Sequence, residues 1–267
     1  MRPRDLLPFF GLTFLIAWGI LALYIFASEM MVRRFGNLTG EHPLFYLAVY
    51  APAIAALVLV LRRQGIPGLR RFLSQLLVWR LPKAWTLFLI AGLPIPFFLG
   101  ALVQGHLSAW ALDAPRSLLP LMGMMLIKGP IEELGWRGLA QPLLQRRMRP
   151  LAAALVLGVA WGLWHYPAFL LSGTPQSAWH FGAFFVGTIA LSVIVTALFN
   201  LSQGSLLVPV LFHFQMINPL WPDGQPFDTL FFVLLAAGVT WLNWKSMWGG
   251  VDAVTKVCPG ALAGGLS

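Results

Sequence analysis

Three ionisable side chains, Glu132, Glu133 and Arg137, lie close together in the otherwise apolar segment GPIEELGWRG at residues 129–138. Apolar runs flank this segment, so the three groups would lie about 15–20 Å deep in a membrane span, at a rise of 1.5 Å per residue. Ionisable groups at that depth are costly and usually functional. A positioned carboxylate can act as the general base that activates water for hydrolysis.

The spacing of these groups divides their roles. Glu133 and Arg137 are four residues apart with the acid first, which favours a same-face ion pair, so we expect a structural pair. Glu132 points about 100° away around the helix and is left for chemistry. An alternative is an ion pair between Lys128 and Glu132, although the Gly-Pro step at 129–130 interrupts the helix between them.

Two of the five histidines, His165 and His213, lie inside other predicted spans. A single histidine within a membrane is more often a packing residue that forms hydrogen bonds. Two of them together with an unpaired Glu132 favour a hydrolytic site. The helix of His165 also carries a stripe of small residues that lets a neighbour approach closely, formed by Ala154, Gly158 and Gly162.

The composition indicates that these residues are held by membrane helices. Hydrophobic residues make up 58% of the 267 positions and charged residues only 10%, against about a quarter in soluble domains. The single Cys258 offers neither an intramolecular disulfide nor a cysteine zinc site. Several apolar runs reach the roughly 20 residues that cross a bilayer.

We therefore predict an all-α polytopic membrane protein, a bundle of about eight transmembrane helices. The N-terminal apolar run has no small-residue cleavage site and is expected to be a retained span. Residues 1–249 would form one catalytic domain with its motif core at 117–219, and residues 250–267 a short cytoplasmic tail. The predicted spans lie near 8–31, 44–62, 84–103, 117–142, 151–171, 178–200, 206–219 and 227–248.

The net charge of +9 reflects topology rather than nucleic-acid binding. Thirteen lysines and arginines lie on the side of the termini and three on the other side, so the positive-inside rule places both termini in the cytoplasm, in the cell (inner) membrane. Membrane lipids are therefore expected partners and nucleic acid is not. The larger set is Arg2, Arg4, Arg62, Arg63, Arg70, Arg71, Arg80, Lys83, Arg146, Arg147, Arg149, Lys245 and Lys256, and the smaller set is Arg33, Arg34 and Arg116.

A further helix is expected in the connection between the second and third spans. Residues 67–83 carry leucines and a phenylalanine at helical spacing with arginines off that face. This pattern is typical of an amphipathic helix at the anionic inner leaflet. A basic loop that only fixes topology is the alternative.

Three sequence blocks resemble the CAAX-protease and bacteriocin-processing (CPBP) intramembrane proteases, which include the type II CAAX prenyl endopeptidases. EELGWR at 132–137 fits a Glu-Glu-x-x-x-Arg motif, and WGLWH at 161–165 fits Phe-x-x-x-His with a tryptophan in place of the first aromatic. HFQMIN at 213–218 approximates His-x-x-x-Asn/Asp. The family pattern expects Asn or Asp at Ile217, whereas this chain has Asn218 one position later.

This resemblance implies peptide-bond hydrolysis of a membrane-anchored protein or peptide within the membrane. Glu132 would activate water, and His165 and His213 would position it or stabilise the oxyanion; Asn218 would join the site only if its helix deforms. The same Glu132, His165 and His213 could instead hold zinc with an open position, a choice that the sequence leaves open.

Two functions of other classes remain as alternatives. Glu132, His165 and His213 could form the relay of a proton-coupled transporter, although no inverted repeat is evident. The displaced Asn218 also admits a non-proteolytic scaffold or immunity factor of the same family. Motifs of other membrane proteases, His-Glu-x-x-His, Gly-x-Ser-x-Gly and Gly-x-Gly-Asp, do not occur in the chain.

Overall fold

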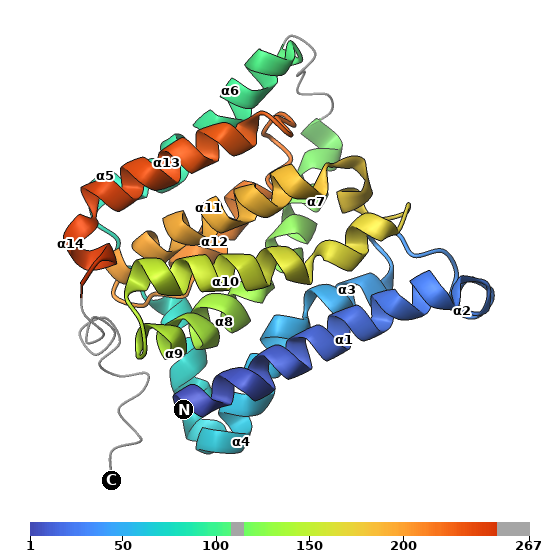
Figure 1. Cartoon of the computed structure of the whole chain (residues 1–267), viewed down its shortest axis with the longest axis horizontal. Helices are drawn as coiled ribbons and strands as arrows, with labels where there is room; N and C mark the ends of the chain where they lie inside the picture. The colour runs from blue at the N-terminus through green and yellow to red at the C-terminus, as the bar shows by residue number, and fades with distance from the viewer. Residues whose placement is uncertain (108–114, 250–267) are drawn as a thin grey trace.

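A computed structural model describes residues 1–107 and 115–249, and in these ranges the chain forms helices joined by turns, without a β-strand (Figure 1). The all-α fold is thereby confirmed; the predicted tail at 250–267 lies outside the described residues. The α-helices are α1 (Leu6–Phe26), α2 (Ser28–Phe35), α3 (Pro43–Val49), α4 (Ala51–Ser74), α5 (Lys83–Leu87), α6 (Ile95–Gln104), α7 (Pro115–Lys128), α8 (Glu133–Gly135), α9 (Gln141–Gln145), α10 (Pro150–Trp164), α11 (Phe181–Leu201), α12 (Leu207–Met216), α13 (Asp228–Leu242) and α14 (Trp244–Met247).

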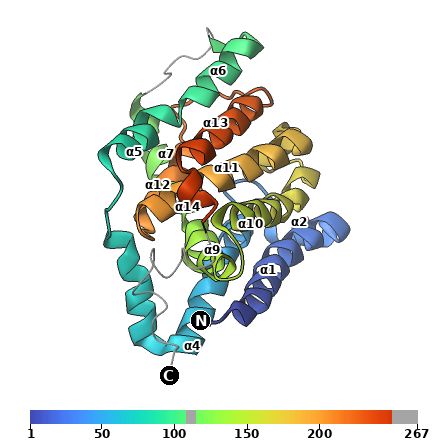
Figure 2. The same cartoon turned by 60° about the vertical axis from the view of Figure 1, so that its left-hand side comes forward.

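Helices α1, α10, α11, α13 and α6 pack side by side in this order, which can be followed in Figure 2. The small-residue stripe of α10 permits its close contact with α11. A Cβ atom built on Gly158 would lie 2.8 Å from the Cα of Ile189, too near for any side chain to fit without a backbone shift. Helices α3 and α4 pack against α1, α8 packs against α4, α9 against α10, and α12 against α11.

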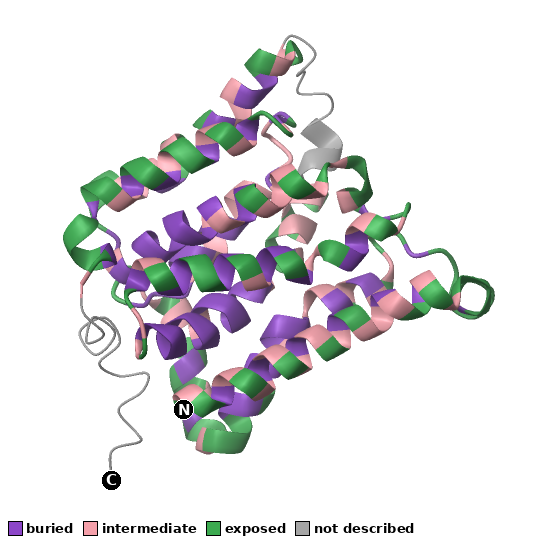
Figure 3. Ribbon diagram, viewed as in Figure 1, coloured by how far each residue is buried: buried purple, intermediate pink, exposed green. Residues whose placement is uncertain are grey.

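Burial follows the expected membrane pattern. Side chains of α8, α9 and the inner faces of α10 and α11 are buried, whereas the outer helices show exposed stripes (Figure 3). Helix α1 buries residues at intervals of four, including Phe9, Thr13 and Ala17, and exposes Leu7 to 81%. Apolar surface of this extent on a helix bundle is suited to lipid rather than water.

Four helical segments among the described residues are long and apolar enough to cross a membrane, and a bent pair gives up to five. They are Pro3–Phe26, Lys83–Gln104, Pro150–Leu170 and Phe181–Leu201, with Pro43–Val49 and Ala51–Leu77 as the pair bent by 56°. The multi-helix membrane fold agrees with the prediction, while the count of eight stays a prediction. The expected spans at 206–219 and 227–248 correspond to the shorter apolar helices α12 and α13.

The predicted span at 117–142 is not one continuous helix. It ends as α7 at Lys128, passes through a 3₁₀ turn at Pro130–Glu132, and resumes as α8, a π-helical turn at Trp136–Ala140, and α9. Pro130 explains the break, because it lacks an N–H group and its ring clashes with the preceding helical turn. Irregular backbone at membrane depth is tolerated where it is buried or lines a cavity.

The helix expected in this connection is present but shorter than predicted, and its place at the membrane interface stays a prediction. The chain breaks at Gly65, where φ is +64°, and continues as a helix through Ser74 and a 3₁₀ turn to Leu77. Residues 78–82 are not helical, so the predicted end at residue 83 is wrong. Val78 is already extended, at φ −92° and ψ 126°, and Pro82 lies where the next helix, α5, begins.

One end of the bundle gathers most of the basic residues, and we call it the basic end. Arg146 Nη1 donates to the Met1 carbonyl at 2.8 Å, and the Arg149 guanidinium lies 5.3 Å from the Trp248 ring centre. The N-terminus, the turn between α9 and α10, and the region after α14 therefore lie together (Figure 1). The loops at 36–42, 172–180 and 218–227 lie at the other end.

Candidate active site

Glu132 lies at the break in the fourth predicted span and is only 3% exposed. Two indole groups donate to the same carboxylate oxygen, Oε2: Trp161 Nε1 at 3.0 Å and Trp136 Nε1 at 3.3 Å. The other oxygen, Oε1, receives no hydrogen bond from the described residues. The carboxylate is thus fixed through one oxygen, and the second is left for a bound molecule.

Trp161 is the residue that links the charged groups of this region. The Arg137 guanidinium carbon lies 4.6 Å from the centre of the Trp161 indole ring. The distances from the Trp161 ring centre to the ring centres of His213 and His165 are 5.5 and 6.0 Å. A cation above an indole face is attracted by the ring quadrupole. Because Trp161 also donates to Glu132, one side chain sets the relative positions of four ionisable groups.

Glu133 and Arg137 are both fully buried, and Arg137 Nη1 lies 3.3 Å from each Glu133 oxygen. Glu133 has a second partner that the sequence did not indicate. His213 Nδ1 lies 2.7 Å from Glu133 Oε1. Glu133 therefore joins Arg137 to a histidine of α12, and it orients that imidazole ring with Nδ1 turned to the carboxylate.

Gly129 provides the space that His213 occupies. A Cβ atom at this position would lie 2.6 Å from His213 Nε2 and 2.9 Å from its Cδ2. Any side chain at residue 129 would therefore displace the imidazole. Gly129 therefore makes room for the His213 ring, in addition to its place at the break in the helix.

His165 is held by its own helix at the end of α10. Its Nδ1 lies 2.8 Å from the Trp161 carbonyl oxygen. A carbonyl oxygen can only accept, so Nδ1 carries the hydrogen, and Nε2 of the neutral ring has a free lone pair. The ring is packed edge-on against Trp164 and Phe184, with centre distances of 4.7 and 5.0 Å.

A cavity of about 360 Å³ brings Glu132, His165, His213 and Asn218 to one surface. Its walls are mostly apolar and aromatic, and they come from α3, α6, α7, α10–α13 and the loops at the end opposite the basic end. A mainly apolar pocket with a few converging polar groups is the usual form of a ligand site. Other lining residues include Phe45, Val49, Phe97, Lys128, Gly129, Trp161, Gln176, Trp179, Phe184, Trp221, Asp223, Asp228 and Thr229.

Asn218 reaches the cavity because α12 ends before it. The helix stops at Met216 and Ile217 leaves helical geometry at φ −115° and ψ 15°. Asn218 lies one position later than the family pattern expects, but because the helix has already ended, this offset does not rotate its side chain away around a continuous helix. The Asn218 amide donates to Gln215 Oε1 at 3.0 Å and its carbonyl accepts from the Leu220 N–H at 3.0 Å.

Lys128 does not pair with Glu132, so the alternative ion pair is absent. Its Nζ lies 5.5 Å from the Phe45 ring centre and 5.6 Å from that of Tyr46. The backbone break at residue 129 turns the lysine toward α3 rather than along the face of Glu132.

The donor types for a metal are present, but their arrangement does not form a cluster. Imidazole nitrogens and a carboxylate are suitable zinc ligands. Among the described residues, however, no three histidine, cysteine, aspartate or glutamate side chains lie close enough to share one metal ion.

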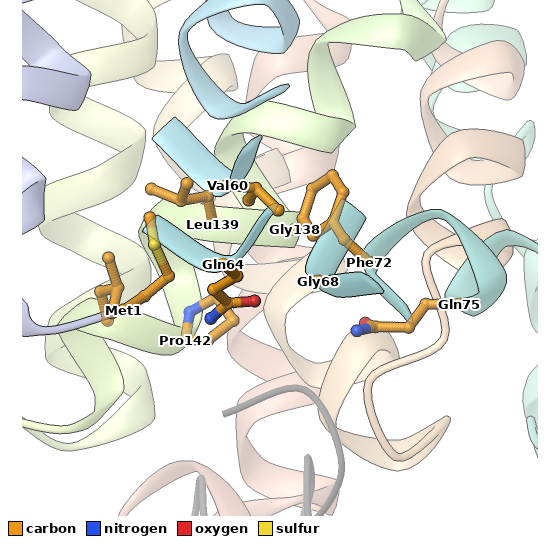
Figure 4. Close-up of a pocket in the computed structure, with 10 residues that line it drawn as sticks. Met1, Val60, Gln64, Gly68, Phe72, Gln75, Gly138, Leu139 and Pro142 are labelled. Carbon is orange, nitrogen blue, oxygen red and sulfur yellow. The ribbon is translucent and has the colours of Figure 1, made fainter. Parts of the chain in front are cut away.

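A second cavity, at the basic end, is much smaller (Figure 4). Its volume is about 20 Å³, and it lies between α4 and the π-helical turn, with Met1, Gln64, Phe72 and Gly138 in its wall. This volume holds about one water molecule. It carries none of the candidate catalytic residues and is too small for a peptide.

The part of the chain that holds Glu132, His165 and His213 is also the part that matches a known protein family. Residues 114–217 match the family model described as type II CAAX prenyl endopeptidase Rce1-like. The chain is 25% identical over 211 residues to CAAX prenyl protease 2 of Methanococcus maripaludis, which covers 71% of this chain and 77% of that protein. It is 24% identical over 209 residues to Lysostaphin resistance protein A of Staphylococcus epidermidis, covering 74% of this chain but only 53% of the relative.

Proposed function

We propose that this chain is an intramembrane endopeptidase of the CPBP family that hydrolyses a membrane-anchored protein or peptide, and its match to the Rce1-like family model and its similarity to CAAX prenyl protease 2 support this. The observation that carries this proposal is the asymmetry of the Glu132 carboxylate. Its Oε2 is fixed by two indoles, and its Oε1 is available beside the 360 Å³ cavity. A buried carboxylate with one open oxygen is suited to accept a proton from water.

The two histidines are assigned different roles on the basis of their hydrogen bonds. His165 presents an unprotonated Nε2, which can accept a hydrogen from the attacking water. His213 lies against Glu133, whose carboxylate can balance the charge of an imidazolium. His213 therefore serves as the donor that stabilises the oxyanion of the tetrahedral intermediate, a contribution of roughly 3–4 kcal/mol for one preorganised donor.

Glu133 and Arg137 act as positioning residues in this proposal. Their ion pair is fully buried, and it joins α12 to the broken fourth segment through His213. The proton that Glu132 takes from water would later pass to the leaving amine, as expected of a group that acts first as a base and then as an acid. Asn218, at the cavity wall, is a candidate contact to the substrate.

We also assign the basic end to the cytoplasm, with the protein in the cell (inner) membrane. The support is the charge distribution: twelve of the basic residues on the terminus side are described, and Arg33 and Arg34 lie at the other end. Under this topology the loops at 172–180 and 218–227, which contribute to the cavity, face away from the cytoplasm.

The test is cleavage of membrane-tethered peptides by purified protein in lipid nanodiscs, compared between the wild type and Glu132→Gln. The substitution keeps the shape of the side chain and removes its basicity, so we expect a loss of about 10²–10⁴-fold in turnover with folding unchanged. Substrates are to be found by comparing membrane peptides from cells that carry either form. Wild-type turnover by Glu132→Gln on a cleaved substrate would falsify the assignment of the base.

A further inference from the structure

Gln215 joins the end of α12 to the third predicted span. Its side-chain amide donates through Nε2 to the carbonyl oxygens of Leu89 and Ile90, at 3.1 and 3.3 Å. Its Oε1 accepts from Asn218 Nδ2 at 3.0 Å. The described residues that line the 360 Å³ cavity include Asn218 but not Gln215. Gln215 therefore acts on the cavity through Asn218.

A proline explains why this part of the third span can accept the Gln215 amide. Residues Phe88–Gly92 form a π-helical turn, and Pro94 follows it. The N–H of residue 94 would donate to Ile90 in an α-helix and to Leu89 in a π-helix, but proline has no N–H group. A backbone carbonyl that is freed within a membrane span has to find another donor. The Gln215 amide supplies that donor from the neighbouring helix.

The two ends of this chain of hydrogen bonds fix the direction of each amide. Backbone carbonyls only accept, so Gln215 turns its Nε2 toward the π-helical turn and its Oε1 toward Asn218. At the other end the Leu220 N–H only donates, so Asn218 Oδ1 faces it at 3.0 Å. Flipping either amide would place donor against donor and acceptor against acceptor. Asn218 Nδ2 carries two hydrogens, and the one that Gln215 does not accept forms no hydrogen bond with the described residues.

We propose that Gln215 is a positioning residue, which fixes the Asn218 amide so that Nδ2 offers its second hydrogen to a carbonyl oxygen of a peptide in the cavity. This inference rests on the proposed peptidase function. Because α12 ends at Met216, the helix no longer fixes the position of Asn218, and these hydrogen bonds take over that role. Gln215 thereby compensates for the one-residue displacement of Asn218 from the family pattern.

The first test is a double-mutant cycle on kcat and KM for a membrane-tethered peptide that the wild type cleaves in lipid nanodiscs. The variants are Gln215→Met, Asn218→Ala and the pair, with Gln104→Met on α6, away from the cavity wall, as the matched control. Gln215→Met keeps the length of the side chain and removes its amide. We expect it to lower kcat/KM by about 2–13-fold, the equivalent of one net hydrogen bond.

The loss should appear in the same parameter, kcat or KM, as the loss caused by Asn218→Ala. Gln215→Met should have no further effect once Asn218 is alanine, because it acts through that residue. Gln104→Met should cleave like the wild type.

The second test needs no cleavage. The full chain is labelled with ¹⁵N-asparagine, and Asn218→Ala identifies the side-chain amide signal of Asn218. We expect Gln215→Met to shift this signal and to leave the other asparagine signals in place, whereas Gln104→Met should leave all of them in place. Thermal unfolding of the same samples shows that the variants are folded. The chain has four asparagines, Asn37, Asn200, Asn218 and Asn243.

Two results would overturn the proposal. If Gln215→Met leaves the Asn218 signal unchanged, the glutamine does not position that amide. If the effects of Gln215→Met and Asn218→Ala on kcat/KM multiply, Gln215 acts through the packing of α12 and not through Asn218. A shifted Asn218 signal in a protein that cleaves no peptide would support the positioning by Gln215 and refute the peptidase function, and cleavage with an unchanged signal would do the reverse.

Discussion

Replacement of Arg137 by methionine tests how far the buried charges support one another. Removing one partner of a buried ion pair costs about 3–5 kcal/mol, because the other charge is left without compensation. Glu133 has a second partner, since His213 Nδ1 stays within 2.7 Å of it. We therefore expect Arg137→Met to fall at the lower end, about 3 kcal/mol, or about 6–12 °C in melting temperature for a chain of this size.

The reciprocal change should cost more. Glu133→Gln leaves a fully buried guanidinium whose Nε and Nη2 already lack hydrogen-bond partners among the described residues. The expected loss is at the upper end, about 5 kcal/mol or about 10–20 °C. The double variant Glu133→Gln/Arg137→Met removes both charges and should melt above Glu133→Gln alone.

The assay is thermal unfolding of detergent-extracted protein at one fixed scan rate, since membrane proteins often unfold irreversibly. The exposed Arg33→Met is the matched control and should melt like the wild type. Peptide cleavage is measured on the same samples. If Arg137→Met melts like the wild type while cleavage disappears, the arginine is catalytic and the positioning role assigned to it is wrong.

Four further predictions concern the site and the topology. His165→Ala and His213→Ala should each lower turnover nearly as much as Glu132→Gln, and pairs of these changes should be no worse than the worst single one, as for residues of one catalytic unit. Gly129→Ala should lower turnover with little change in extraction yield, because its Cβ would meet His213 Nε2 at 2.6 Å; wild-type turnover would contradict the close contact. Treatment with a chelator should leave activity unchanged, with the metal content of the protein measured on the same sample. Loss of activity on chelation and its recovery on return of zinc would show that zinc holds the water. Reporter fusions after residues 40 and 224 should report the outside and those after 75 and 148 the cytoplasm; inversion at two sites would end the topology assignment.

The helical framework can be predicted from the sequence because the length of each apolar run largely decides where a membrane helix lies. The runs that become α1, α10 and α11 were each placed within a few residues, since a long apolar segment has few other solutions in a bilayer. The break at Gly129 and Pro130 was also evident from residue type. The short helices α12 and α13 and the end of the interfacial helix were less predictable, since packing against neighbours decides where a helix ends.

The partners of the acids could not be predicted from spacing. Trp136 is four residues after Glu132 and Trp161 is four before His165, a signal that was available in the sequence. Nothing in the sequence shows that both indoles meet the same oxygen of Glu132. The contact between Glu133 and His213 joins residues 80 positions apart, and the packing of α12 against the broken segment creates it. Local periodicity cannot report such long-range contacts.

The two adjacent glutamates differ because their partners differ in charge. Glu133 Oε1 meets both Arg137 and His213, Oε2 lies 3.3 Å from Arg137 Nη1, and the fully buried carboxylate does not line the cavity. Glu132 receives only neutral indole donors, both on one oxygen. A charged partner would compete with water for that carboxylate, whereas a neutral donor fixes its orientation and leaves the second oxygen basic. Two adjacent residues of an irregular helix therefore have different roles, Glu132 as a candidate base and Glu133 as a positioning acid. The Glu132→Gln variant should lose turnover but keep its stability, whereas the Glu133→Gln variant should lose both.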